Sequence, residues 1–115
     1  AQSAGIEALN CKKEILSMKK SYLDRRNIII DNLKKIGLPV IKPEGAFYCF
    51  PSIKHTGLSS QEFAIKLLKN YNVAVVPGNA FSKYGEGYIR CCYATNEKIL
   101  NEATKRIGAF LKNIN

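Results

Sequence analysis

The feature that most constrains the fold is a helical pattern of apolar residues from about Ala4 to Ile36, which predicts one long helix or two abutting helices. The apolar positions recur in steps of three and four: Cys11, Ile15, Met18, Tyr22, Ile29, Leu33 and Ile36. Gly37 and Pro39 follow, and this pair is typical of a helix end.

Such a helix would be longer than the domain that this chain can form. At about 1.5 Å per residue it would span about 50 Å, whereas a domain of about 100 residues has a radius of gyration of about 13 Å. We therefore expect its N-terminal third to overhang the domain and to contact another domain or another subunit. The alternative is a bend near Ser17 that folds this part back onto the core.

Two strands and a second helix are expected after Pro39. Residues Gly45–Phe50 form an apolar and aromatic run that Pro51 ends, which predicts a strand. Ser59 and Glu62 have the spacing of a capping box, so a helix should begin there and end at about residues 70–72. The β-branched run Val73–Val76 predicts another strand.

The last third of the chain predicts a third strand and a final helix. Residues Gly85–Tyr93 read as a buried strand, and Thr95 or Asn96 can cap the helix that follows. The element order is therefore α-β-α-β-β-α over residues 1–115, which make one domain. This order predicts the α/β class, as an α+β two-layer sandwich with helices packed on a small, mostly antiparallel sheet.

Arg90 is the residue that does not suit its strand. Successive strand residues alternate faces, so Arg90 shares one face with Tyr88 and Cys92. A guanidinium in an apolar strand needs an anionic partner or a surface position, and its geometry suits bidentate binding of a carboxylate or phosphate. Two interpretations remain open: an anion-binding site, or an Arg on the open face of an edge strand or in a structural salt bridge.

The cysteines predict no metal site. Cys11, Cys49, Cys91 and Cys92 form no C-x-x-C pair, and His55 is the single histidine. Buried thiols in a reducing compartment are the simpler interpretation, and we expect a cytoplasmic protein. No apolar run approaches the roughly 20 residues that span a bilayer, so no membrane partner is expected.

The net charge of +9, from 18 Lys and Arg against 9 Asp and Glu, raises the possibility of a nucleic-acid partner. The basic residues are dispersed along the helical patterns, however, and no RNA-binding motif is present. We therefore expect no nucleic acid. No pattern typical of a hydrolase nucleophile, a zinc protease or an acid/base carboxylate pair occurs either. The residues favour anion binding over catalysis.

Three segments, Pro43–Tyr48, Val73–Phe81 and Gly85–Thr95, closely resemble the C-terminal small domain of class I/II pyridoxal-phosphate aminotransferases, which are fold type I enzymes. Ala1-Gln2 and Arg25-Arg26 are also similar to that family, and the bacterial-type aspartate aminotransferases are the branch that the chain resembles. The resemblance covers essentially all 115 residues.

The resemblance implies a role for Arg90, because the Arg of the family's Tyr-x-Arg motif binds the α-carboxylate of the amino-acid substrate. Phe47 and Tyr48 resemble a segment that approaches the active site, and no role is assigned to them. Two positions depart from the family pattern: Cys92 stands where Ser is usual, and Ser82 where Gly is common. Neither departure removes the Arg.

The resemblance also implies what the full-length enzyme would contain. The catalytic Lys and the groups that bind pyridoxal 5'-phosphate come from a large domain in this family, so the chain alone is expected to be inactive, with no catalytic or cofactor-binding residue. About residues 1–14 would belong to the helix that links to that missing large domain. The full-length protein is expected to be a homodimer that uses amino-acid and 2-oxo-acid substrates.

Two alternatives to an aspartate aminotransferase are kept. The first is another fold type I enzyme, such as a different amino-acid aminotransferase, a lyase or a decarboxylase, since these share the position of Arg90. The second is a free-standing basic module that binds nucleic acid or a protein partner.

Overall fold

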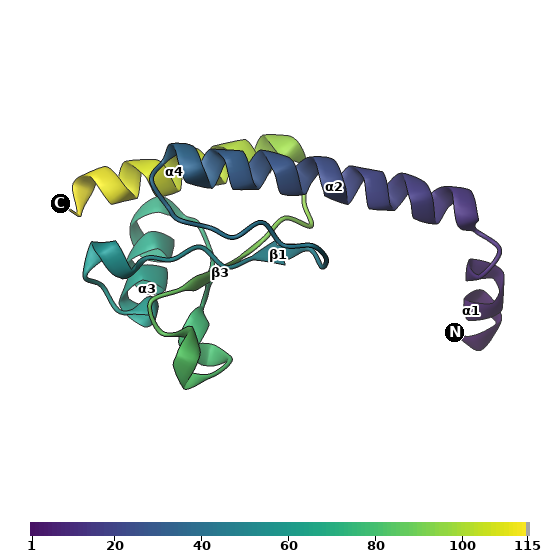
Figure 1. The fold of residues 1–115 in the computed structure, drawn as a ribbon, viewed down its shortest axis with the longest axis horizontal. Coiled ribbons are helices and arrows are strands. Elements are labelled where there is room, and N and C mark those ends of the chain that lie inside the picture. The colour runs from purple at the N-terminus through teal and green to yellow at the C-terminus, as the bar shows by residue number, and fades with distance from the viewer. Residues whose placement is uncertain (115) are drawn as a thin grey trace.

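Figure 1 shows the computed structural model, which describes residues 1–114, as helices packed on a small sheet. The helices are α1 (Gln2–Ala8), α2 (Lys12–Lys35), α3 (Ser60–Tyr71) and α4 (Glu97–Asn113). The strands are β1 (Tyr48–Cys49), β2 (Val76–Pro77) and β3 (Ile89–Cys92). Short 3-10 turns lie at Lys54–Thr56, Gly78–Ala80 and Lys83–Gly85. The predicted element order is confirmed, with the first helix divided into two.

The N-terminal helices extend beyond the rest of the molecule. Every residue from 1 to 21 is exposed, whereas the buried residues of α2 are Ile29, Ile30 and Leu33 near its C-terminal end. Only the C-terminal part of the predicted apolar stripe is therefore buried, whereas Ile15 and Met18 in its N-terminal part are 48% and 58% exposed. The chain bends between α1 and α2, not near Ser17, and α1 lies at the far end of α2, away from the sheet (Figure 1).

The C-terminal end of α2 follows the predicted stop signal. Gly37 has a φ of 86°, the left-handed conformation that glycine adopts without a steric penalty. Its N–H donates to the Lys34 carbonyl, and the Leu38 N–H donates to the Leu33 carbonyl, both at 3.0 Å. These two bonds form a Schellman motif, which satisfies helix carbonyls that would otherwise lack donors.

The sheet has the order β1-β3-β2, with both pairs antiparallel. Cys49 is paired with Cys91, and Val76 is paired with Arg90. The mostly antiparallel sheet is confirmed. β3 is its central strand, so the interpretation that placed Arg90 on an edge strand is wrong.

All three strands are shorter than predicted. β3 is regular only from Ile89, because Lys83–Gly85 form a 3-10 turn and Gly87 has a φ of 81°. Ala46 has a φ of 63°, which is outside the extended region, so β1 cannot begin at Gly45. At its other end, Pro51 has no N–H to donate to a neighbouring strand. The predicted strand at Val73–Val76 is regular only from Val76, and Asn72 before it has a φ of 54°.

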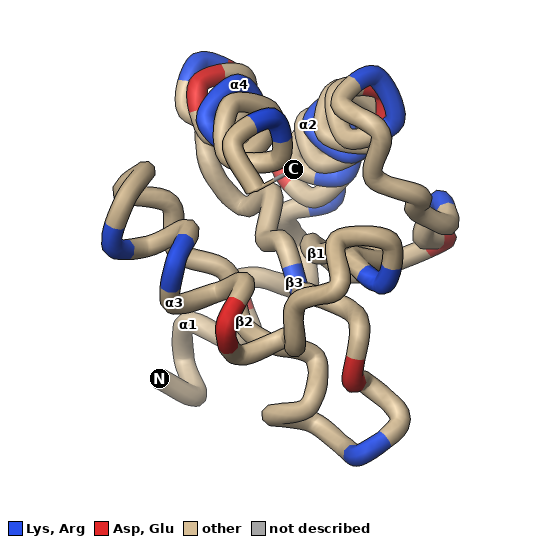
Figure 2. The backbone as a smooth tube through the Cα atoms, turned by 90° about the vertical axis from the view of Figure 1, so that its left-hand side faces the viewer, with Lys and Arg blue, Asp and Glu red and all other residues tan. Residues whose placement is uncertain are grey.

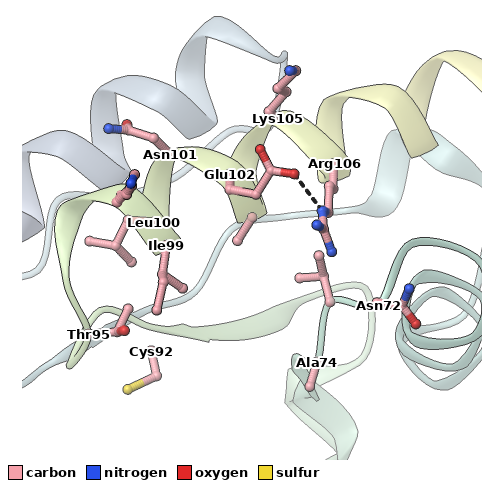
Figure 3. A pocket seen from close by; sticks show the side chains of 13 residues that line it. Asn72, Ala74, Cys92, Thr95, Ile99, Leu100, Asn101, Glu102, Lys105 and Arg106 are labelled. Carbon is pink, nitrogen blue, oxygen red and sulfur yellow. Dashed lines mark hydrogen bonds and ion pairs between the residues drawn. The ribbon is translucent and has the colours of Figure 1, made fainter.

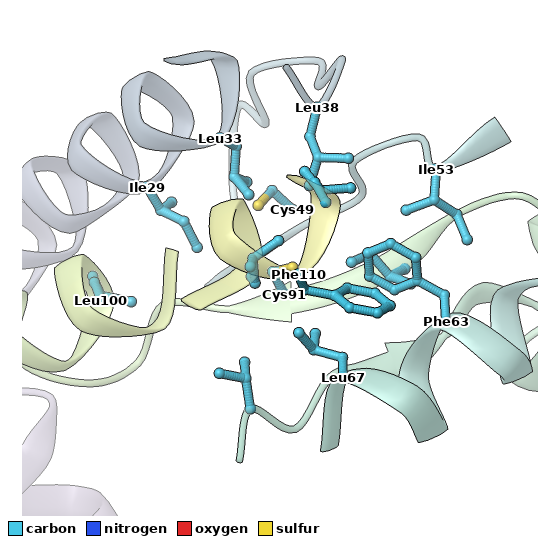
Figure 4. Close-up of a cluster of buried hydrophobic side chains, with 14 of the residues drawn as sticks. Ile29, Leu33, Leu38, Cys49, Ile53, Phe63, Leu67, Cys91, Leu100 and Phe110 are labelled. Carbon is cyan, nitrogen blue, oxygen red and sulfur yellow. The ribbon is translucent and has the colours of Figure 1, made fainter. Parts of the chain in front are cut away.

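One hydrophobic core joins the helices to the inner face of the sheet (Figure 4). Its centre includes Ile29 and Leu33 of α2, Phe63 and Leu67 of α3, Phe110 of α4, and Ile89, Cys91 and Tyr93 of the strand region. The rings of Phe63 and Phe110 meet edge to face, with 4.9 Å between their centroids. Burial of these apolar surfaces is the main source of stability for a domain of this size.

Both predicted helix caps are present. The Ser59 side chain accepts a hydrogen bond from the Glu62 N–H, and the Glu62 carboxylate accepts one from the Ser59 N–H, which completes the capping box. The bonds from the Ser59 backbone and side chain hold the pKa of Glu62 below its usual value. The Asn96 side chain accepts from the Ile99 N–H at 2.9 Å and caps α4.

Within residues 1–114, no helix combines the length and the apolar character that a bilayer crossing would require.

Candidate functional site

Arg90 lies in the middle of β3, on the face of the sheet away from the core. Ile89, Cys91 and Tyr93 are buried, whereas Tyr88 and Arg90 are half-buried and Cys92 is exposed. This is the alternation that the sequence predicts for a strand with one buried face. The central strand therefore presents the guanidinium on an open face of a rigid sheet.

Two aromatic rings hold the guanidinium of Arg90. Its central carbon lies 5.3 Å from the ring centroid of Tyr48 on β1 and 4.8 Å from that of Phe81, which follows the 3-10 turn at residues 78–80. Phe50 contacts Phe81 edge to face, at 5.8 Å between centroids. Cations over aromatic faces are stabilised by the ring quadrupole, and such contacts restrict the side chain while leaving in-plane N–H groups for an anion.

Arg90 has no acidic partner in the described part of the chain. The single ion pair found there joins Arg106 and Glu102 on α4, at 2.8 Å. The Nε of Arg90 is buried and has no hydrogen-bond acceptor among residues 1–114. Among residues 1–114, Arg90 therefore forms no structural salt bridge. A fixed guanidinium with unused donors is the arrangement expected of a site for a carboxylate or another oxyanion.

The position of Phe81 depends on a close approach between Gly78 and Gly85. A Cβ added to Gly78 would overlap the Gly85 carbonyl oxygen and would lie 2.8 Å from the Tyr88 carbonyl oxygen. The Gly78 N–H donates to that Tyr88 carbonyl at 2.8 Å, and the Phe81 N–H donates to the Gly78 carbonyl at 3.1 Å. The loop between β2 and β3 is thus compact because two glycines allow its backbone segments to meet.

Ser60 fixes the turn that leads into β3. Its side chain is fully buried and accepts hydrogen bonds from the N–H groups of Gly87, at 2.8 Å, and Tyr88, at 3.2 Å. In return, the Glu86 carboxylate accepts from the Ser60 N–H at 2.7 Å. The first turn of α3 and the start of the Arg90 strand are therefore held together by reciprocal hydrogen bonds.

The Ser60→Ala variant should lower the free energy of unfolding by about 1–3 kcal/mol, because the Gly87 N–H would remain buried without an acceptor. Chemical denaturation of the full-length protein measures this change. Ser52→Ala is the matched control, since its hydroxyl accepts only an exposed 3.4 Å bond from the Lys54 N–H. Equal effects of the two substitutions would contradict the role given to Ser60.

The other ring at Arg90 depends on the turn before β1. The Tyr93 hydroxyl donates to the Ala46 carbonyl at 3.0 Å, and the Tyr93 N–H donates to the Phe47 carbonyl at 2.8 Å. Burial is the main cause of a raised pKa for Tyr93, and the nearby Arg26 guanidinium partly opposes it. The phenol therefore keeps its proton and serves as a donor at neutral pH.

A separate groove of about 790 Å³ lies between α4 and the link from α3 to β2 (Figure 3). Asn72 and Ala74 line one side, and Ile99 and Glu102 of α4 line the other. Glu102 is paired with Arg106 there. Arg90 is not among the lining residues, so this groove is distinct from the candidate site.

The cysteines do not form a metal centre in the described residues, where no group of three His, Cys, Asp or Glu side chains has suitable geometry. Cys49 and Cys91 are buried free thiols on paired strands, and Cys11 and Cys92 are exposed. The hydrogen bond between Cys49 and Cys91, together with burial, raises the pKa of Cys91 well above its usual value. This thiol is therefore protonated and a poor nucleophile.

The basic residues are dispersed in space as well as in sequence. Figure 2 shows Lys and Arg on both long helices and on the loops, with Asp and Glu among them on α2 and α4. This distribution gives no support to the nucleic-acid interpretation, which requires a basic patch or stripe.

The model of the family "aminotransferase class I and II" matches residues 1–107. The chain belongs to this family. It is 52% identical over 112 residues to the putative aminotransferase YugH of Bacillus subtilis, and 48% identical over 115 residues to the aspartate aminotransferase of Pyrococcus horikoshii. Each alignment covers 96% of this chain and 29% of the relative.

Solved structures of aminotransferases have the same fold. The aromatic aminotransferase of Pyrococcus horikoshii superposes with a TM-score of 0.89 at 46% identity, over 93% of this chain and 29% of that protein. The aspartate aminotransferase of Thermotoga maritima gives 0.87 at 36% identity, over 96% and 28%. The chain thus spans less than a third of these relatives, and the predicted fold class is confirmed.

The family implies pyridoxal phosphate in full-length enzymes, but the described residues near Arg90 do not fit this cofactor by themselves. It requires a lysine amine and a carboxylate that face it across a cavity. The amines of Lys54 and Lys83 lie over the rings of Tyr88 and Tyr84, at 4.8 and 5.2 Å from the centroids. The Glu86 carboxylate is bonded to the Ser60 N–H. The described residues around Arg90 therefore offer a guanidinium without an acidic partner, and the nearby amines and the Glu86 carboxylate are engaged in other contacts.

Proposed function

We propose that this chain is the small domain of a pyridoxal-phosphate-dependent aminotransferase, in which Arg90 binds the α-carboxylate of the amino-acid or 2-oxo-acid substrate. The observation that supports this role is the guanidinium without an acidic partner among residues 1–114, held between Tyr48 and Phe81 on the open face of the sheet. Bidentate binding by two guanidinium N–H groups would fix both the position and the orientation of the substrate carboxylate.

The groups that bind the cofactor are assigned to the rest of the full-length protein. The aligned relatives are more than three times as long as this chain, whose aligned part is 29% of their length. We propose that about residues 1–14, which comprise α1 and the start of α2, link the small domain to this large domain. The exposed apolar side chains Ile6, Leu9 and Ile15 are available to pack against it. We further expect the full-length protein to be a cytoplasmic homodimer.

Aspartate is the amino-donor that we propose. Several relatives that align over most of this chain are named aspartate aminotransferases, among them those of Pyrococcus horikoshii and Pyrococcus abyssi. Other relatives are named for aromatic amino acids and for N-acetyl-LL-diaminopimelate, and the residues around Arg90 contact only the part that all amino acids share. Side-chain preference would therefore be set mainly outside this chain.

Substrate profiling tests this proposal. The full-length protein with pyridoxal phosphate should transfer the amino group of aspartate to a 2-oxo acid faster than that of phenylalanine or of alanine. A preference for an aromatic amino acid would support the proposed aminotransferase activity but would show that aspartate is not the preferred amino donor. Release of carbon dioxide or ammonia without amino transfer would instead favour a decarboxylase or a lyase on the same scaffold.

The isolated chain should be inactive, because we assign the catalytic lysine and the phosphate-binding groups to the large domain. Purified residues 1–115 mixed with pyridoxal phosphate, aspartate and a 2-oxo acid as amino acceptor should give no oxaloacetate above the rate without protein. Turnover by this chain that depends on protein concentration would contradict the division of roles between the two domains.

A further inference from the structure

We propose that Arg26 is a positioning residue for the carboxylate site, because it holds the turn that places Tyr48 against Arg90. This inference rests on the proposed function of Arg90. Arg26 lies on α2, on the side of the sheet away from Arg90, and it would act without touching the substrate.

Arg26 makes a directional contact with the turn before β1. Its Nη1 donates to the Pro43 carbonyl at 3.0 Å, across 17 residues of the chain. Its Nη2 has a longer 3.4 Å contact with the Asn27 side chain, and its Nε is buried without an acceptor among the described residues. A buried donor without an acceptor is unfavourable, so the side chain is held in this pose by its other contacts, including that with Pro43.

The turn has little other support on the side of α2. A cleft of about 370 Å³ separates α2 from residues 44–47, and Tyr22, Arg26 and Phe47 are among its lining residues. Residues 44–47 are exposed, and Phe47 is 50% exposed. Apolar packing does not fill this space, and Arg26, which lines it, donates a hydrogen bond to the carbonyl of Pro43 directly before these residues.

Two residues therefore hold the two ends of the turn. Arg26 binds the carbonyl of Pro43 at its start, and Tyr93 binds the carbonyls of Ala46 and Phe47 at its end. Between them the backbone passes through the left-handed conformation of Ala46, which an alanine adopts only where its surroundings require it. Tyr48 follows directly, and its ring is one of the two that hold the Arg90 guanidinium.

The link from Arg26 to Arg90 predicts a specific kinetic result. In the full-length protein, Arg26→Met should raise the KM for aspartate and the Kd of a 2-oxo-acid competitor by about fivefold, the change that corresponds to one hydrogen bond. The kcat and the amount of bound pyridoxal phosphate should change by less than about twofold. A general loss of folded protein would instead lower kcat and cofactor content together.

Three further variants make the test specific. Arg26→Lys keeps a donor for Pro43 and should restore most of the affinity. Tyr93→Phe removes the bond to Ala46 and should raise the same Kd, which keeps the test valid if Arg26→Met does not fold. Arg25→Met is the matched control: Arg25 lies over the Tyr22 ring, at 5.5 Å from its centroid, and should leave the Kd unchanged.

The possible outcomes separate this inference from the proposed function. If Arg90→Ala weakens substrate binding while Arg26→Met and Tyr93→Phe do not, the inference about Arg26 is overturned and the carboxylate site stands. If Arg90→Ala has no effect on substrate binding, the proposed function itself fails.

Discussion

Arg90→Ala in the full-length protein should lower kcat/KM for aspartate by about 30- to 4000-fold. This range corresponds to about 2–5 kcal/mol, the cost of removing one partner from a buried, hydrogen-bonded charge pair. The cause would be loss of the group that binds and orients the substrate carboxylate, while Tyr48 and Phe81 would still line the site. Steady-state kinetics with varied aspartate and a saturating 2-oxo acid measures the effect.

The comparison with Arg90→Lys separates charge from geometry. Lysine keeps the positive charge, but its ammonium group cannot bind a carboxylate in the bidentate way that a planar guanidinium does. It should therefore recover only part of the lost kcat/KM. Arg25→Ala is the control for removal of an arginine that lies over a tyrosine ring, and it should have little effect. A kcat/KM for Arg90→Ala within twofold of the unsubstituted protein would contradict the assigned role.

Gly78→Ala should both destabilise the protein and weaken substrate binding. The new Cβ would overlap the Gly85 carbonyl oxygen, which belongs to the backbone and cannot rotate away. Displacement of the loop should lower the free energy of unfolding by about 1–3 kcal/mol, the usual cost of overpacking a tight site. Because the Phe81 N–H is bonded to Gly78, the ring over Arg90 should move as well and the KM for aspartate should rise.

Thermal unfolding and steady-state kinetics on the same preparation test the two effects of Gly78→Ala together. Gly45→Ala is the control for the stability effect alone, since a Cβ at that exposed position would meet no atom within 4 Å and its φ is not positive. If Gly78→Ala unfolds at the temperature of the unsubstituted protein, the close approach of the two loop segments is not present in solution.

Local signals in the sequence predicted the helix ends well. The stop at Gly37 and the cap at Ser59 depend on residues within a few positions of one another, and both appear in the structure with the expected hydrogen bonds. The alternation around Arg90 also depends only on strand geometry, and the buried and open faces lie where it placed them.

Features that depend on distant contacts could not be predicted in the same way. The central place of β3 follows from pairing with two strands that are far from it in sequence, and no local pattern records that choice. The contacts of the Tyr48 and Phe81 rings with Arg90 could not be predicted either, because they join residues that are distant in the sequence. The sequence places Phe81 in a loop after the Pro77-Gly78 turn. The orientation of its ring, however, depends on the contact between Gly78 and Gly85.

The role of Arg26 was missed for a related reason. In the sequence it is one of many basic residues on a long helix, and dispersed residues of this kind usually form a solvated face. Only the folded chain brings it to the Pro43 carbonyl, at the point where α2 leaves the core. The resemblance to aminotransferases marked Arg25-Arg26 as a family feature without indicating a function.

A crystal structure of the full-length protein with a bound 2-oxo acid would test the central claim most directly. Both carboxylate oxygens should lie within about 3 Å of the terminal nitrogens of Arg90, with the guanidinium still between Tyr48 and Phe81. A carboxylate bound by another cation, with Arg90 turned to solvent or paired with an acidic residue of the large domain, would contradict it.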